Sequence, residues 1–292
     1  MALYTFTATD QNDFVSKLLS HAVGEGWTLV RDNATEKVLK IPAVGYLALL
    51  ISGVNIEFQA FRLYDAGRAI ADQIGALPTP TPAGGLQLPR VPLHNQPFFV
   101  WLSISERRLA GVCRISNTYH SFYAGLLLPF APTDQYPFPC YLGGSGDADT
   151  WSSTSPAVSA YPFYGGQSRP GRVCLPGGGW QQVSRADAGD SLDFRPSYIY
   201  ELAYIWPFDG GLANLGKTLD GEHIIYNAMI VSSTPSIGLA TDDGMWLGYL
   251  DGIFACCNVG ASAESVITID SVQYLLVPNV FRGAQYYAFR LN

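Results

Sequence analysis

The chain is poor in charged residues, and this scarcity limits the kind of protein it can be. Lys, Arg, Asp and Glu make up 14% of its 292 residues, whereas hydrophobic residues make up 48%. So low a charge fraction leaves little polar surface to cover an isolated monomer. We therefore expect considerable apolar and aromatic surface to be buried between subunits.

The sequence also lacks the marks of membrane insertion, disulfide stapling and metal binding. It has no run of about 20 apolar residues and no charged-then-apolar signal layout, so we expect a chain made in the cytoplasm without a membrane span. Its five cysteines are odd in number and include no CxxC pair, which favours buried, apolar thiols. Its four histidines show no HxH or HxxxH spacing, so we expect no metal and no cofactor.

The net charge of −7 is unevenly distributed. Residues 1–130 hold 10 Lys/Arg and 9 Asp/Glu, whereas residues 131–292 hold 7 and 15. Nonspecific nucleic-acid affinity comes mainly from Lys and Arg neutralising phosphates. The acidic C-terminal half therefore argues against a nucleic-acid partner.

One helix and many strands are predicted. The helix spans 10–23, with Thr9 or Asp10 as N-cap, Gly24 just beyond its end and an apolar stripe at Phe14, Leu18 and Ala22. Strands are predicted at 27–31, 37–41, 46–51, 55–63, 98–105, 109–115, 119–128, 198–206, 223–231, 236–240, 245–250, 266–269, 272–277 and 285–291. Asp270 and Ser271 are predicted to form the turn of a hairpin. A type I′ turn needs positive φ at both positions, and positive φ is unfavourable for Ser.

These elements predict a mainly β fold with antiparallel, sandwich-like sheets and long loops rich in Gly, Pro and aromatic residues. We expect an N-terminal α+β region over 1–76 and a Pro-rich connector over 77–97. A β-rich domain over 98–292 would follow, with a long loop insertion at about 129–195.

Residues 211–218, GLANLGKT, match the P-loop pattern GxxxxGK[ST]. The match would make Lys217 a phosphate ligand and Thr218 a magnesium ligand. A P-loop needs a helix directly after this point, because the helix N-terminus holds the phosphates. The β-branched run that follows favours a chance match instead.

Two kinds of catalytic site can be drawn from the sequence, and neither is favoured. A glycosidase pair could come from Glu201, Asp242, Asp243 and Asp251, beside a sugar platform of Trp206, Trp246 and Tyr249. A cysteine nucleophile could come from Cys113, Cys256 or Cys257 beside His120 or His223. The aspartates are more simply turn residues and the cysteines buried ones, so we expect no catalytic residues.

Aromatic residues make up 13% of the chain, including 17 Tyr. Tyr and Trp are enriched at interfaces, since they give large contact area at low entropic cost, although ordinary core packing explains any one of them equally well. The local clusters are Tyr119, Phe122 and Tyr123; Tyr136, Phe138 and Tyr141; and Tyr161, Phe163 and Tyr164. The candidate interface residues are Tyr136, Phe138, Tyr141, Tyr161, Phe163, Tyr164, Trp180, Phe281, Arg282, Tyr286 and Tyr287.

Several motifs resemble a family of virion structural proteins of tailed bacteriophages. The N-terminal motifs are TATD at 7–10 and GEGW at 24–27, and the middle ones are Arg107-Arg108, residues 119–125 and YPFP at 136–139. The C-terminal motifs are LDGIF at 250–254, the hairpin at 266–275, NVFR at 279–282 and residues 287–291. The Pro-rich connector and the Asp270-Ser271 turn depart from the family pattern.

The resemblance implies a non-enzymatic virion component that forms homo-oligomeric rings, most simply at the tail tip, the baseplate or a fibre-attachment ring. Its partners would be other tail proteins, and it would lie in the virion tail after assembly in the host cytoplasm. The alternatives are a receptor-binding tail module for a host glycan or pilus, a neck or head-proximal ring protein, and a tail-associated polysaccharide hydrolase.

Overall fold

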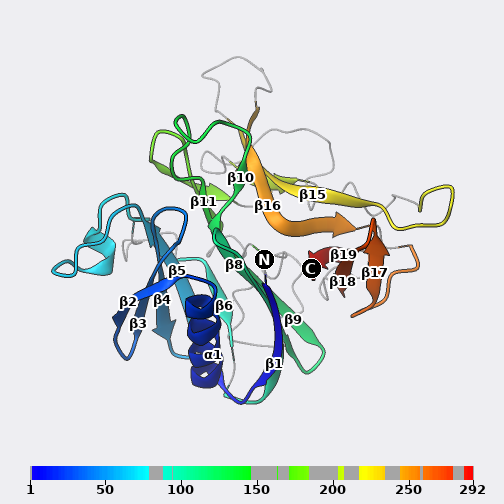
Figure 1. Ribbon diagram of the computed structural model, residues 1–292, viewed down its shortest axis with the longest axis horizontal. Helices are drawn as coiled ribbons and strands as arrows, with labels where there is room; N and C mark the ends of the chain where they lie inside the picture. Colours follow the sequence, from blue (N-terminus) through cyan, green and yellow to red (C-terminus); the bar gives the residue numbers. More distant parts are fainter. Residues whose placement is uncertain are drawn as a thin grey trace.

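The computed structural model of the chain is mostly β-structure, with antiparallel sheets and a helix near the N-terminus (Figure 1). It describes residues 2–78, 88–93, 95–145, 163, 171–183, 203–206, 217–233, 244–256, 259–278 and 286–291. The mainly β fold with a small α part, predicted from the sequence, is confirmed. No helix within these ranges is long and apolar enough to cross a membrane.

The strands form three antiparallel sheets. The central sheet has the order β1 (Ala2–Ala8), β7 (Phe98–Ile104), β8 (Arg108–Ile115), β9 (Thr118–Leu126), β11 (Cys140–Gly144), β12 (Gly171–Cys174) and β13 (Trp180–Val183). The N-terminal sheet has the order β2 (Thr28–Asp32), β3 (Glu36–Lys40), β4 (Tyr46–Ser52), β5 (Asn55–Phe61) and β6 (Arg90–Pro92). The C-terminal sheet has the order β14 (Ala203–Trp206), β15 (Ile225–Ser233), β16 (Gly244–Cys256), β19 (Tyr286–Arg290), β18 (Val272–Pro278) and β17 (Val266–Ile269), and β10 (Leu128–Pro129) pairs with β16.

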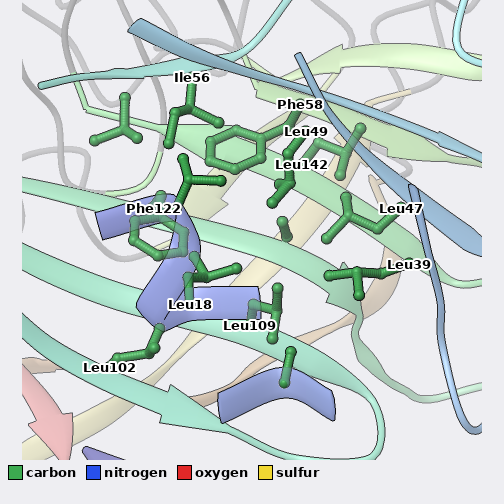
Figure 2. Packing of buried hydrophobic residues seen from close by; sticks show 14 of the residues in the cluster. Leu18, Leu39, Leu47, Leu49, Ile56, Phe58, Leu102, Leu109, Phe122 and Leu142 are labelled. Atoms are coloured by element: carbon green, nitrogen blue, oxygen red, sulfur yellow. The ribbon is translucent and has the colours of Figure 1, made fainter. Parts of the chain in front are cut away.

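The central sheet is covered on both faces. One face packs against the N-terminal sheet and helix α1 (Gln11–Gly24), where Leu18, Phe58 and Phe122 meet (Figure 2). The other face packs against the C-terminal sheet, through residues such as Val112 and Leu250. A strand buried on both faces carries apolar side chains at successive positions instead of alternate ones. This burial explains the hydrophobic composition of the strands within residues 98–126.

Helix α1 is fixed at both ends by local hydrogen bonds. The Asp10 carboxylate accepts from the backbone N–H of Asn12 at 2.8 Å and of Asp13 at 2.9 Å, so Asp10 is the N-cap. At the other end the N–H of Trp27 donates to the carbonyl of Ala22 at 3.0 Å. The left-handed residue that permits this bond is Gly26, with φ of 89°. The prediction of Gly24 as the residue just beyond the helix is therefore wrong, because Gly24 is the last residue of the helix and Gly26 takes the C′ position.

Most strand predictions are confirmed to within a few residues, including the meander of β7, β8 and β9. The predicted hairpin at the turn 270–271 is formed by β17 and β18, with positive φ at Asp270 (49°) and Ser271 (66°). These dihedrals fit a type I′ turn. The predicted strand at 236–240 lies outside the described residues.

The expected division of the chain does not coincide with its cores. Strand β1 pairs with β7, β6 lies inside the expected connector and pairs with β5, and one hydrophobic cluster draws on both regions. The expected loop insertion at 129–195 contributes β11, β12 and β13 to the central sheet. The sequence missed these strands because they are short and separated by Gly- and Pro-rich segments.

Candidate functional site

A buried arginine joins the central sheet to the C-terminal sheet. The side chain of Arg108, at the start of β8, is 1% exposed. Its Nη1 donates to the carbonyl and the hydroxyl of Ser103 at 2.7 and 2.8 Å, and its Nε donates to the carbonyl of Asp251 at 3.1 Å. The Asp251 carboxylate lies 3.4 Å from Nε. Burial lowers the pKa of Arg108, and the Asp251 charge opposes this shift.

Neighbouring residues complete this junction. The hydroxyl of Tyr123 donates to the carbonyl of Leu126 at 2.7 Å and accepts from the N–H of Asp251 at 3.3 Å. Gly252 has φ of 76°, and a Cβ there would lie 2.7 Å from Nη2 of Arg108. The Arg107-Arg108 and Leu250-Asp251-Gly252 motifs therefore meet at one point, and their role is to hold two sheets together.

A second contact joins the same two sheets at their other end. The Glu264 carboxylate accepts from Nη1 of Arg114 at 2.5 Å and from the hydroxyl of Tyr119 at 2.7 Å. The Arg114 guanidinium also lies over the rings of Phe99 and Trp101. Desolvation and the hydrogen bond to Glu264 raise the pKa of Tyr119 to about 12. This clamp fixes the turn that leads into β17.

Apolar side chains are exposed where β10 pairs with β16. Phe130 is 52% exposed and Trp246 is 53% exposed, and Met245 is also exposed. The ring of Phe130 lies 5.7 Å from that of half-buried Tyr249. Leu247 and Leu250 of the same strand enter the core, whereas Tyr249 is only half-buried. We call Phe130, Met245, Trp246 and Tyr249 the β16 surface patch.

Most of the candidate interface aromatics within the described residues are interior, and for them the expectation of a surface role is corrected. Tyr136, Phe138, Tyr141, Phe163 and Tyr287 are all buried. Their polar groups are used inside the chain: the hydroxyl of Tyr141 donates to the carbonyl of Phe163 at 2.7 Å, and that of Tyr136 donates to the carbonyl of Cys174. These side chains belong to the two hydrophobic cores between the sheets, so they fill the interior rather than the surface.

The remaining candidates are partly buried or not described. The side chains of Trp180 and Tyr286 are partly buried, and the indole N–H of Trp180 donates to the carbonyl of Gly75 at 3.1 Å. The other candidates, Tyr161, Tyr164, Phe281 and Arg282, lie outside the described residues, as does the NVFR motif.

The described residues of the P-loop match and of the glycosidase candidates do not have the geometry that either function needs. Lys217 and Thr218 are exposed, and residues 218–233 form a turn and strand β15 instead of the helix that a P-loop needs. Asp251 faces Arg108, as described above. The other expected carboxylates, Glu201, Asp242 and Asp243, and the side chain of Trp206 lie outside the described part of the chain.

The structure brings two of the expected Cys/His pairs together. Cys113 and His120 are opposite each other on β8 and β9, and Sγ of Cys256 lies 3.9 Å from Nδ1 of His223. Both thiols are buried, and burial raises the pKa of Cys113, which disfavours its nucleophilic thiolate form. Within the described ranges no cluster of three or more His, Cys, Asp or Glu could hold a metal ion.

Comparison with known proteins adds no assignment. No protein-family model matches the chain, and no curated protein matches it significantly.

Proposed function

We propose that the chain is a non-enzymatic structural subunit of a tailed-phage virion, at the tail tip, in the baseplate or in a fibre-attachment ring. The motifs that resemble tailed-phage proteins support membership of a phage virion. The β16 surface patch is the observation that supports a role in assembly. Exposed apolar side chains gathered on one strand suit contact with another protein. The partners of the subunit would be other copies of the chain and other tail proteins.

The mechanism we propose is interface burial rather than chemistry. In a ring, one subunit's patch meets a different patch on its neighbour, and the rotation closes. Large aromatic anchors such as Trp246 carry much of the binding energy in such contacts, commonly about 2 kcal/mol or more each. Loss of Trp246 should therefore weaken assembly without unfolding the subunit.

Electron microscopy of virions that carry a tagged subunit tests membership and position together. Label at the distal tail supports the proposal, whereas label at the neck moves the protein to the head-tail joint. Purified particles without label would refute the structural role.

A pair of matched variants tests the patch itself. Trp246→Ser should leave the thermal midpoint of the isolated subunit nearly unchanged and reduce its incorporation into particles. Leu63→Ser is the control, because Leu63 is 57% exposed and follows β5 of the N-terminal sheet, which packs on the opposite face of the central sheet from β16. Equal incorporation of both variants would exclude the patch as an assembly contact.

The same patch favours one second candidate, a receptor-binding tail module. Exposed Trp246 and Phe130 beside Tyr249 offer aromatic faces of the kind on which sugar rings stack. Specific binding of the isolated protein to host cells, lost in Trp246→Ser, would favour this candidate over a ring subunit.

A further inference from the structure

A second buried arginine, Arg172, differs from Arg108 in having no hydrogen-bond or ion-pair partner among the described residues. Arg172 on β12 is 7% exposed, and Gln182, directly opposite on β13, is 8% exposed. Arg172 also pairs in register with Leu142 on β11. Cys174, two residues further along β12, packs into the core beside the N-terminal sheet, so Arg172 lies on that same face of the central sheet.

Neither side chain is satisfied within the part of the chain that the structure describes. The guanidinium of Arg172 has no hydrogen bond and no ion pair there, and Oε1 of Gln182 is enclosed without a partner. Buried charges in proteins are normally paired, because burying an isolated charge is strongly unfavourable. Burial lowers the pKa of Arg172 to about 10, and no carboxylate in the described ranges opposes this shift.

We propose that Arg172 is the anchor of an oxyanion-binding site at the β12–β13 end of the central sheet. The guanidinium presents a planar fork that binds two oxygens of a carboxylate or phosphate at once. Rotation of the Gln182 amide about its last side-chain bond would turn its NH₂ group toward the same oxygens as an additional donor.

The oxyanion has two sources that share this chemistry: a free anion, or a carboxylate of a neighbouring subunit. The second source rests on the proposed function. It agrees with the charge of the chain, because residues 131–292 hold 15 Asp and Glu against 7 Lys and Arg. A neighbouring copy would therefore present acidic side chains.

The test compares two buried arginines in the isolated full chain by thermal unfolding in chloride and in phosphate at equal ionic strength. Arg172→Met should unfold at the same temperature as the wild type or higher in chloride, because it removes an unpaired buried charge. Arg108→Met, the matched control, should unfold at a lower temperature, because Ser103 and Asp251 lose their donor. Phosphate or acetate should raise the midpoint of the wild type, and Arg172→Met should bind these anions about 10- to 100-fold more weakly.

The outcomes separate the two sources. An anion response that Arg172→Met abolishes supports the site and a free anion. No anion response, with a folded Arg172→Met subunit that fails to enter particles, supports a neighbour's carboxylate. No anion response with normal incorporation overturns the site, as does an Arg172→Met chain that is less stable in chloride. The anion measurement uses the isolated chain, whereas the proposed function is tested by electron microscopy of virions that carry a tagged subunit. A negative anion result therefore leaves the test of the structural role independent.

Discussion

Removal of the Asp251 carboxylate should destabilise the protein strongly, because it takes from buried Arg108 the negative charge of Asp251. Breaking a buried ion pair by removing one partner costs about 3–5 kcal/mol. In Asp251→Ala the three hydrogen bonds from Arg108 to Ser103 and to the backbone carbonyl of residue 251 remain, and the lost contact is 3.4 Å long. We therefore expect a loss at the lower end, about 3 kcal/mol in the free energy of unfolding.

Denaturant titration measures this loss, and a thermal scan should show a midpoint about 6–12 °C lower, from about 2–4 °C per kcal/mol for domains of this size. Asp32→Ala is the matched control, because Asp32 pairs with Lys37 at the surface and its loss should cost about 1 kcal/mol or less. The double variant Arg108→Met/Asp251→Ala should recover part of the loss. A change below about 0.5 kcal/mol in Asp251→Ala would refute the view that this pair holds the two sheets together.

Ser271→Gly should raise the free energy of unfolding by about 0.5 kcal/mol in denaturant titration, because Gly relieves the left-handed backbone; a loss of stability would contradict the turn geometry. Gly45→Ala should cost more than about 2 kcal/mol, because its Cβ would overlap the ring of Phe138, whereas Gly53→Ala, with open space around its Cβ, should cost about 1 kcal/mol; equal losses would count against this packing. Burial lowers the pKa of His21 below 6.5, so the folded state favours the neutral ring and stability should fall as the pH drops below 6.5. His21→Gln should flatten that dependence in unfolding curves measured from pH 7.5 to pH 5, and an unchanged slope would exclude His21 as its source.

The sequence predicted the features that depend on neighbours along the chain. The N-cap at Asp10 and the hairpin turn at Asp270 and Ser271 follow from local backbone chemistry, and the structure contains both. The sheet junction was missed, because Arg108 and Asp251 are 143 residues apart and nothing local to either shows their pairing. The exposed side chain of Trp246 appeared in the sequence only as part of a sugar platform.

The aromatic candidates show why composition alone cannot separate a core from an interface. Tyr141 and Tyr287 have the same chemical character whether a second sheet or a second protein covers them. What decides between the two is whether the sheet is covered on one face or on both, and this depends on pairings between distant strands. Arg172 was missed for the related reason that its burial and its lack of a partner among the described residues depend on the fold, not on neighbours along the chain.

The position of β19 sets an order on the synthesis and folding of the chain. Because β19 lies between β16 and β18, those two strands cannot be joined until residues 286–290 have left the ribosome. Until then the nascent chain presents two strand edges with unpaired amides and carbonyls, which are templates for mispairing with other nascent chains. A truncation that removes β19 therefore interrupts a sheet, so any loss of particles that it causes reports failed folding before it reports failed assembly.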